Sequence, residues 1–212
     1  MTIPAERLYT HLCWHGTAAG TDLFDLHVAA SILAMAAQDA EASGRTLSEA
    51  CGLGSAELRD LFLLMFPGAA GMLGGLAAAA VVPAADERQL REILFVNSAH
   101  ASPFERLLAH MIARRSLSPD HLWQDLGFGS RRVLSKLMRR HYPRLAERNA
   151  QEMKWKKFFY RMMCAATDYA LCVAPVCSEC DEFDACFGAE DGPSRLARIG
   201  AGPLPLPGEI RA

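Results

Sequence analysis

The chain has 212 residues, enough for one ordinary domain with appendages. Hydrophobic residues make up 51% and charged residues 22%, which excludes wholesale disorder, and the net charge of −2 excludes a generally basic nucleic-acid-binding protein. The charge is nevertheless uneven. Residues 101–165 carry 14 Lys and Arg against 5 Asp and Glu, a net charge of +9. The flanking segments are acidic, with 5 against 11 over residues 1–100 and 3 against 8 over residues 166–212.

Seven cysteines are an odd number, so they cannot all pair within the chain. The N-terminus lacks a charged-then-apolar signal sequence, so we expect a cytoplasmic protein, in which clustered cysteines indicate metal ligation or redox chemistry before disulfides.

Residues 61–85 contain no charged side chain, but two prolines and four glycines interrupt them. Because a membrane span needs about 20 strongly apolar residues, we expect no membrane segment.

The apolar residues follow helical spacing through most of the chain, and no run alternates with the period of two that a strand requires. Residues 22–42 lack Pro and Gly and predict a first helix. Ser55 predicts the start of a second helix, which ends at Phe66 because Pro67 cannot continue it. Asp86 predicts the start of a third.

Residues 102–105, Ser-Pro-Phe-Glu, form a capping box with proline at the first helical position. Ser118 followed by proline repeats the start signal, and Gly127 supplies a stop. Ser130 opens the next helix, and Pro143 closes it.

Asn149 and Glu152 predict the start of the longest helix. Apolar side chains at three-four spacing give this helix a stripe that must face a core. They are Trp155, Phe158, Phe159, Met162, Met163, Ala166 and Tyr169.

The fold class is therefore all-α, a single helical domain with a C-terminal cysteine-rich cluster-binding loop and a flexible tail. The tail is rich in proline and glycine and lacks a periodic apolar face. The expected boundaries are 1–21 for an N-terminal extension, 22–171 for the helical domain, 172–188 for the cysteine loop and 189–212 for the tail.

Two stretches of the helical domain, residues 26–67 and 101–143, resemble each other. Residues 47–55 align with residues 122–130, and both end in Gly-x-Gly-Ser. Each unit is predicted to contain a helix, a short helix, the glycine turn, a helix and a proline. The pattern indicates an internal repeat of helix-turn-helix type. Chance similarity is the alternative, since capped helices reuse Gly, Ser and Leu.

The most informative motif places four cysteines within fifteen residues as C-x4-C-x2-C-x5-C, and they are Cys172, Cys177, Cys180 and Cys186. A loop this short brings the four thiolates to a common centre. Structural zinc sites are more often built from two separated pairs, whereas the first three spacings match the run found in plant-type iron–sulfur proteins. The motif therefore favours an iron–sulfur cluster, with zinc or reactive and structural thiols as alternatives.

Acidic residues surround these thiols, namely Glu179, Asp181, Glu182 and Asp184. Added negative charge lowers the reduction potential of a cluster and leaves the loop facing solvent, as suits a cluster that is handed over. The alternative is that the acids only keep an exposed loop soluble.

The motif, followed by Phe187 and Gly188, resembles the nitrogen fixation protein NifQ family. The similarity covers roughly residues 100–188 and weakens toward residue 25. Upstream it continues through HLWQDLG at 121–127, HYPRLA at 141–146, MKWKKFFY at 153–160 and LCVAP at 171–175.

The resemblance implies a metallochaperone rather than an enzyme. It implies a molybdenum donor that carries a molybdenum–iron–sulfur cluster for biosynthesis of the nitrogenase iron–molybdenum cofactor. The cluster is expected to be of 3Fe-4S type, able to bind molybdenum, with Cys172, Cys177, Cys180 and Cys186 as its ligands. The expected partners are the nitrogenase cofactor assembly scaffold, the iron protein, and molybdate or a molybdenum-storage source, with neither nucleic acid nor a membrane.

The basic middle of the chain agrees with that role, because molybdate is an oxyanion whose reduced form prefers sulfur ligands. Lys154, Lys157 and Arg161 share one face of the last long predicted helix, and we expect them to steer an anion or grip a partner. A solvated helix face is the alternative. His121 is the best candidate for a metal ligand among three histidines of this segment, and a hydrogen-bonded structural histidine is the alternative.

Cys13, Cys51 and Cys164 are expected to lie outside the ligand set, because their neighbours predict a chain terminus or a packed helix. No nucleotide-binding loop and no catalytic constellation stands out. Two other functions stay open. One is an iron–sulfur transcription regulator, in which the basic segment would meet phosphates, and the other is a zinc-stabilised interaction domain.

Overall fold

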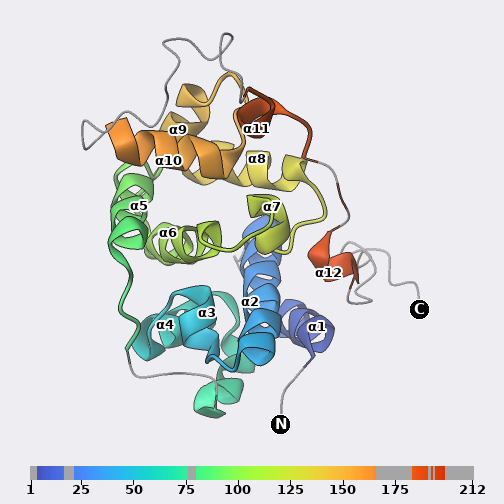
Figure 1. Cartoon of the computed structure of the whole chain (residues 1–212). Coiled ribbons are helices and arrows are strands. Elements are labelled where there is room, and N and C mark those ends of the chain that lie inside the picture. Colours follow the sequence, from blue (N-terminus) through green and yellow to red (C-terminus); the bar gives the residue numbers. More distant parts are fainter. Residues whose placement is uncertain are drawn as a thin grey trace.

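The computed structural model describes residues 4–16, 22–75, 80–165, 183–190, 192 and 194–198. Over these ranges the chain is all-helical and has no strand, as the sequence predicted (Figure 1). The helices are α1 (Ala5–His15), α2 (Leu23–Ser43), α3 (Leu47–Cys51), α4 (Ser55–Met65), the 3-10 helix η1 (Pro67–Gly75), α5 (Ala85–Val96), α6 (Pro103–Ser116), α7 (Leu122–Asp125), α8 (Arg131–His141), α9 (Pro143–Arg148), α10 (Trp155–Ala165), α11 (Phe183–Phe187) and α12 (Arg195–Arg198).

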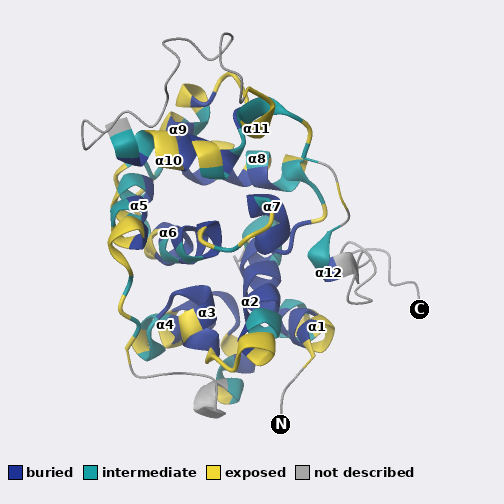
Figure 2. Ribbon diagram, viewed as in Figure 1, coloured by how far each residue is buried: buried dark blue, intermediate teal, exposed yellow. Residues whose placement is uncertain are grey.

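The helices form three tiers (Figure 1). The upper tier holds α8, α9, α10 and α11, the middle tier α5, α6 and α7, and the lower tier α1, α3, α4 and η1. The helix α2 runs from the middle tier into the lower one and is dark along much of its length in Figure 2. No helix in the described ranges is long and apolar enough to cross a membrane.

Apart from Ser31, residues 28–37 of helix α2 are apolar, and eleven residues of the helix are buried, which is typical of a helix inside a core. The Asp22 side chain begins it by accepting hydrogen bonds from the backbone N–H groups of Phe24 at 2.9 Å and Asp25 at 3.2 Å. Gly44, with φ of 65°, ends it. The prediction of a helix over 22–42 is confirmed.

Helix α6 begins as the sequence predicted. The Ser102 hydroxyl accepts a hydrogen bond from the Glu105 N–H at 3.2 Å, and the Glu105 carboxylate accepts one from the Ser102 N–H at 3.0 Å. Glu105 also lies 3.5 Å from the ring of His141, whose other nitrogen lies 2.9 Å from Asp25. The cap therefore joins α6 to α8 and α2 through a buried imidazole.

The two units that resemble each other in sequence also share unusual backbone geometry. Gly52, after α3, has φ of 79°, and Gly127, after α7, has φ of 76°. Phe66 ends α4 with φ and ψ of −136° and 52°, and Tyr142 ends α8 with −134° and 55°. A structural duplication would produce such matched dihedral angles at aligned positions.

The glycine turns pack crosswise between the two units. A Cβ on Gly52 would lie 3.1 Å from the carbonyl oxygen of His110 on α6. A Cβ on Gly127 would lie 2.9 Å from the carbonyl oxygen of Ser31 and 2.5 Å from Met35, both on α2. Each turn thus rests against the long helix of the other unit, and only glycine combines that closeness with a positive φ.

We expect Gly127→Ala to lower the free energy of unfolding by about 2 kcal/mol or more, because a left-handed conformation and a steric clash coincide there. Urea denaturation followed by circular dichroism measures the change. Gly71→Ala is the matched control, because a Cβ at Gly71 meets nothing within 4 Å. Equal stability of the two variants would contradict the argument.

Two helix starts and the identity of the longest helix differ from the predictions. The start expected at Ser118 lies at Leu122, and the start expected at Asn149 lies at Trp155. Glu152 has φ of 54°, a left-handed conformation that interrupts a helix. Within the described ranges α2, not α10, is the longest helix. These errors arise because start signals in sequence do not show where the backbone turns.

The prediction of an N-terminal extension over residues 1–21 is wrong for its described part. Helix α1 packs against α2 and contributes Ala5, Leu8 and Leu12 to the core. Their spacing of three and four residues was available in the sequence, and a short amphipathic helix needs only such a stripe to be buried.

Candidate metal centre and the basic groove beside it

The structure describes one end of the cysteine motif. Cys186 lies in α11 and is half-buried, and its carbonyl oxygen accepts a hydrogen bond from the Lys154 N–H at 2.8 Å. Cys172, Cys177 and Cys180 lie outside the described residues. Among the residues that are described, no group of three His, Cys, Asp or Glu side chains is placed to hold a metal. The motif thus ends against the residue that precedes α10.

Lys154 holds that end of the motif in place. Besides its backbone bond to Cys186, its ammonium group donates to the carbonyl oxygen of Asp184 at 2.9 Å. Its own carbonyl accepts from Phe158 at 2.9 Å, in the first turn of α10. Lys154 therefore anchors α11 to α10, whereas Lys157 and Arg161 are exposed on α10.

A groove of ≈ 490 Å³ lies beside α11, where Ala185, the residue before Cys186, lines it and Cys186 does not. The groove collects His121, Lys154 and Lys157 from the residues that the sequence singled out, and Arg161 does not line it. Its lining is Pro119, Asp120, His121, Leu122, Gln124, Lys154, Lys156, Lys157, Ala185, Glu190 and Gly192. The connection before α7, the start of α10 and the segment around α11 thus meet at one hollow next to a motif cysteine.

His121 precedes α7, and its ring nitrogen Nδ1 lies 3.4 Å from a carboxylate oxygen of Glu190. The other oxygen of Glu190 lies 3.2 Å from the guanidinium of Arg131, the first residue of α8. Arg131 also donates to the carbonyl oxygen of Glu152 at 2.5 Å. His121 thus faces an acid in this structure, and sequence analysis missed Glu190.

Lys156, which sequence analysis also missed, is the lysine of α10 that points inward. Its ammonium group donates to the carbonyl oxygens of Ser118 at 2.5 Å and Asp120 at 2.6 Å, and to the carboxylate of Asp125 at 2.5 Å. An ammonium group has three N–H donors, so all of them are used. Burial lowers the pKa of Lys156 and raises that of the fully buried Asp125.

Two arginines complete this buried charge network. Arg115, on α6, lies 2.6 Å from Asp39 on α2 and donates to the Asp125 carbonyl at 2.8 Å. Arg195, on α12, lies 2.5 Å from Asp39 and 2.8 Å from Asp125. Burial raises the pKa of Asp39, but Arg115 and then Arg195 outweigh it, and the net shift is downward. The name buried charge network is used below for Asp39, Arg115, Asp125, Lys156 and Arg195.

The prediction of a flexible tail over 189–212 is therefore wrong for residues 194–198. Leu196 is buried in the core, and Arg195 is held by the buried charge network. Gly192, with φ of 126°, lets the chain pass close over Gln124, whose amide nitrogen would lie 3.0 Å from a Cβ there. Residues 194–198 are held in place because Arg195 pairs with Asp39 and Asp125, and amino-acid composition does not reveal such a pairing.

We expect Asp125→Ala to lower the free energy of unfolding by about 3–5 kcal/mol, because it leaves Lys156 and Arg195 as buried cations without their partner. Thermal and urea denaturation measure the loss. Asp120→Ala is the matched control, because that carboxylate is half exposed and its contact with Arg195 is long, at 3.5 Å. It should change the free energy of unfolding by about 0.5 kcal/mol or less. If Asp125→Ala lowers the free energy of unfolding no more than Asp120→Ala does, the network contributes little to stability.

The other described cysteines are poor ligand candidates. Cys51 is fully buried, and burial raises the pKa of its thiol to about 12. Burial also raises the pKa of Cys13. Cys164 lies on α10 about 15 Å along the helix axis from Lys154, the residue that holds Cys186. That the three thiols stay outside the ligand set remains a prediction.

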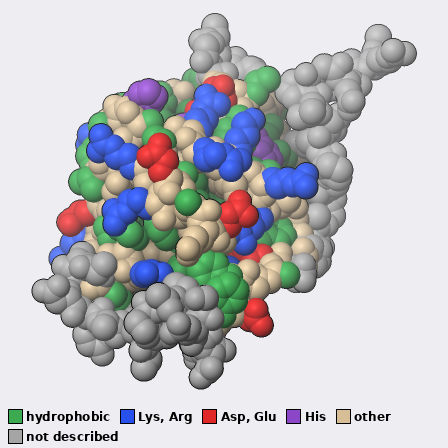
Figure 3. Space-filling model, turned by 90° about the horizontal axis from the view of Figure 1, so that it is seen from above, with side chains coloured by type: hydrophobic (Ala, Val, Ile, Leu, Met, Phe, Trp, Pro, Cys, Tyr) green, Lys and Arg blue, Asp and Glu red, His purple; other side chains and the backbone are tan. Residues whose placement is uncertain are grey.

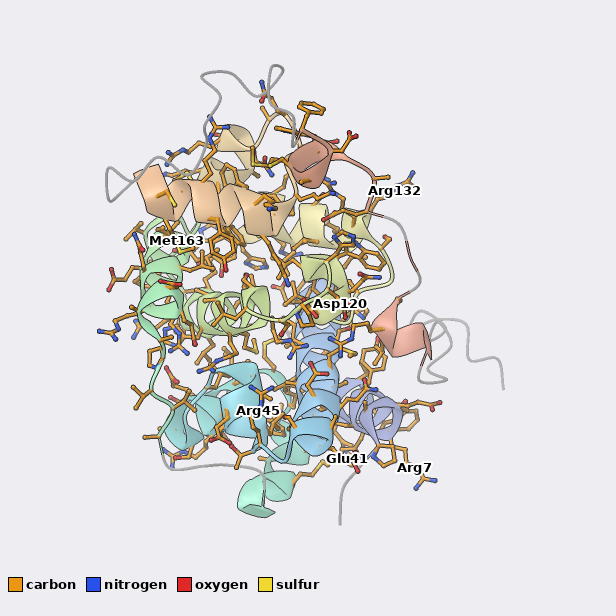
Figure 4. The ribbon with its side chains drawn as sticks, in the orientation of Figure 1. Arg7, Glu41, Arg45, Asp120, Arg132 and Met163 are labelled. Atoms are coloured by element: carbon orange, nitrogen blue, oxygen red, sulfur yellow. The ribbon has the colours of Figure 1, made fainter. Side chains whose placement is uncertain are left out.

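The upper tier carries the positive charge that composition located in residues 101–165. Figure 3 shows Lys and Arg side chains gathered on this face, and Figure 4 shows Arg132 directed away from α8. The exposed cations of α8, α9 and α10 are Arg132, Lys136, Arg139, Arg140, Arg144, Arg148, Lys157 and Arg161. An acidic surface would find complementary charge here.

The structure therefore defines a class of all-helical protein in which one end of a cysteine-rich segment is docked beside a basic groove. The sequence pattern of the NifQ family matches residues 28–188. The chain belongs to the NifQ family of nitrogen fixation proteins.

Relatives agree with this assignment. The chain is 39% identical over 195 residues to the protein NifQ homolog of Sinorhizobium fredii, covering 90% of this chain and 85% of that protein. It is 42% identical over 105 residues to protein NifQ of Rhodobacter capsulatus, covering 50% of this chain and 58% of the relative. With protein NifQ of Klebsiella pneumoniae the identity is 47% over 81 residues, 38% of this chain and 48% of the relative. No solved structure matches the chain.

Proposed function

We propose that this protein is a molybdenum donor for biosynthesis of the nitrogenase iron–molybdenum cofactor, and that it acts as a carrier rather than as an enzyme. Family membership supports the pathway, and the cysteine motif supports a sulfur-bound metal cargo. The observation that carries the proposal is the position of Cys186, which is half-buried and bonded to Lys154 next to a groove lined by Lys154, Lys156 and Lys157.

The residues present fit an iron–sulfur cluster. Cys172, Cys177, Cys180 and Cys186 would hold it, and thiolates are the ligands that both iron–sulfur clusters and reduced molybdenum prefer. A bound cluster of 3Fe-4S type would supply sulfur ligands for molybdenum. The protein's own contribution is to keep Cys186 in place through Lys154 and to present Lys157 to an incoming anion.

The exposed cations of the upper tier support the proposed exchange partners. A source of molybdate delivers an anion, and the cofactor assembly scaffold and the iron protein would have to approach the same face to receive cargo. Charge complementarity raises the rate of such encounters without requiring tight binding. Lys157 and Arg161 lie on α10, the helix whose start anchors the motif, so they are the cations we assign to steering.

One observation favours a second candidate, an iron–sulfur transcription regulator. Helix α8 follows a short helix and a glycine turn and carries exposed arginines, as a helix that meets phosphates would. Against it, Arg131 at its start is bound to Glu152 within the protein. Only the donor requires molybdenum, so metal analysis separates the two functions.

We expect anaerobically purified protein to contain iron and sulfide, and Cys177→Ala or Cys180→Ala to abolish the visible charge-transfer absorption. The reason is that loss of one thiolate from a four-thiolate loop leaves an iron atom without its ligand. Iron analysis and visible spectroscopy make the measurement.

Cys13→Ser and Cys164→Ser are the matched controls, because each removes a thiol from a partly buried position outside the motif. Both should keep wild-type iron. Full iron in the Cys177 and Cys180 variants would refute the cluster assignment, and loss of iron from a folded Cys164 variant would move that residue into the ligand set.

Reversal of Lys157 and Arg161 to Glu should leave the iron content intact but slow the delivery of molybdenum several-fold, and wild type at raised salt should show the same defect. Exposed charges act through fields that salt screens, with a Debye length of about 8 Å at physiological ionic strength. A reconstituted cofactor-maturation assay with molybdenum-loaded protein and matched iron occupancy measures delivery.

The control reverses Arg7 and Arg59, which are exposed on α1 and α4 in the tier opposite α10 (Figures 1 and 4). It changes the net charge equally and should deliver molybdenum normally. Normal delivery by the Lys157 and Arg161 variant would remove the steering role. If wild-type, molybdenum-loaded protein fails to support maturation without added molybdate, the donor function itself is wrong.

A further inference from the structure

Glu190 lies between the imidazole of His121 and the guanidinium of Arg131. Its carboxylate lies 3.4 Å from His121 Nδ1 and 3.2 Å from Arg131 Nη1, and its side chain is only 5% exposed. Its oxygen Oε2 is buried and accepts no hydrogen bond from any residue that the structure describes. A buried carboxylate without hydrogen bonds is unfavourable, so this arrangement needs an explanation.

The same molecule shows what a fully satisfied buried carboxylate looks like. Asp125 lies 2.5 Å from Lys156 and 2.8 Å from Arg195, and both contacts are hydrogen bonds. The contacts of Glu190 with His121 and Arg131 are longer, at 3.4 Å and 3.2 Å. Its oxygen Oε2 accepts no hydrogen bond from a described residue. Glu190 therefore occupies the space between His121 and Arg131 but does not satisfy the hydrogen-bonding capacity of its own carboxylate.

Arg131 and the backbone of His121 have partners other than Glu190. Arg131 Nη2 donates to the carbonyl oxygens of Glu152 at 2.5 Å and Met153 at 3.4 Å, which leaves Nη1 directed at the carboxylate. The backbone N–H of His121 donates to the side-chain oxygen of Gln124 at 3.3 Å, at the start of α7. The Arg131 guanidinium and the His121 backbone would therefore stay in place if Glu190 moved away.

The groove beside α11 opens onto the contact between His121 and Glu190, since both line it together with Lys154 and Lys157. Its volume of ≈ 490 Å³ far exceeds that of a small inorganic ion. A tetrahedral oxyanion presents acceptors in four directions, whereas the carboxylate presents two oxygens in one plane. An anion in the groove would meet His121 and Lys157, and one that replaced the Glu190 carboxylate would also meet Arg131, which does not itself line the groove.

We propose that His121 and Arg131 form a seat for a tetrahedral oxyanion, and that Glu190 is a tethered acid that fills the seat until the anion displaces it. The seat is distinct from the cysteine ligands and lies beside Cys186. It rests on the proposed function in one respect, that molybdate is the oxyanion of interest. Glu190 then acts as a competitor built into the chain, which sets the anion concentration at which the seat loads.

Other acids near the seat do not serve this purpose. Asp125 is used by Lys156 and Arg195, and Asp120 is half exposed and faces Arg195 at 3.5 Å. Lys156 has no free donor for an anion. Glu190 is therefore the acid whose removal should expose the guanidinium of Arg131 and the imidazole of His121.

The test is titration calorimetry of the full-length protein with molybdate, sulfate and phosphate at low chloride concentration. We expect Glu190→Gln to bind molybdate about tenfold more tightly than wild type, because an internal competitor and its negative charge are removed. Adding Arg131→Gln or His121→Gln to that variant should abolish the gain. Asp120→Asn is the matched control, which removes an equal charge at the groove and should change affinity less than about twofold.

Equal molybdate affinity in wild type and Glu190→Gln would overturn the proposal, and so would a gain that survives both the Arg131 and the His121 substitutions in folded protein. Thermal denaturation of each variant establishes folding. Comparable binding of sulfate or phosphate supports the seat as a general oxyanion site. If no anion binds while wild type still delivers molybdenum in the maturation assay, the seat is wrong and the donor function stands; the reverse result keeps the seat and rejects the donor.

Discussion

Asp125 keeps its carboxylate inside the protein, fully buried, and Lys156, Arg115 and Arg195 surround it. With Asp39 these residues come from α2, α6, α7, α10 and α12, so one buried charge network joins the amino-terminal unit, the carboxy-terminal unit and the tail. Removing one member would leave the others as uncompensated buried charges. The groove depends on the network, since Lys156 fixes both the start of α10 and the connection before α7.

The same contacts fix the chain on both sides of the described end of the cysteine motif. Lys154 ties the Cys186 end of the motif to α10, while Glu190 and Arg195 tie the chain that follows to α7, α8 and the buried charge network. A functional group held at this position would be supported by several helices and not by one loop.

Several features followed from sequence alone because their causes are local. The all-helical class follows from apolar spacing, the Ser102 cap from four adjacent residues, and the four-cysteine motif from its own spacing. The family resemblance covered residues 100–188, and the family match spans 28–188. The sequence could not predict which of Lys154, Lys156 and Lys157 is buried, which anchors α11 and which is exposed. The three lysines are neighbours in the sequence, and their roles differ only because other parts of the fold lie opposite them.

By itself the sequence determined the helical class, the resemblance to the family and the four-cysteine motif, since periodicity and short-range spacing are written in neighbouring residues. Tertiary structure alone decided that Lys156 is buried on Asp125, that Arg195 docks part of the tail, and that Glu190 lies between His121 and Arg131. Those contacts join residues 31 to 156 positions apart along the chain. Charge complementarity over such separations depends on how the helices pack, which no local pattern encodes.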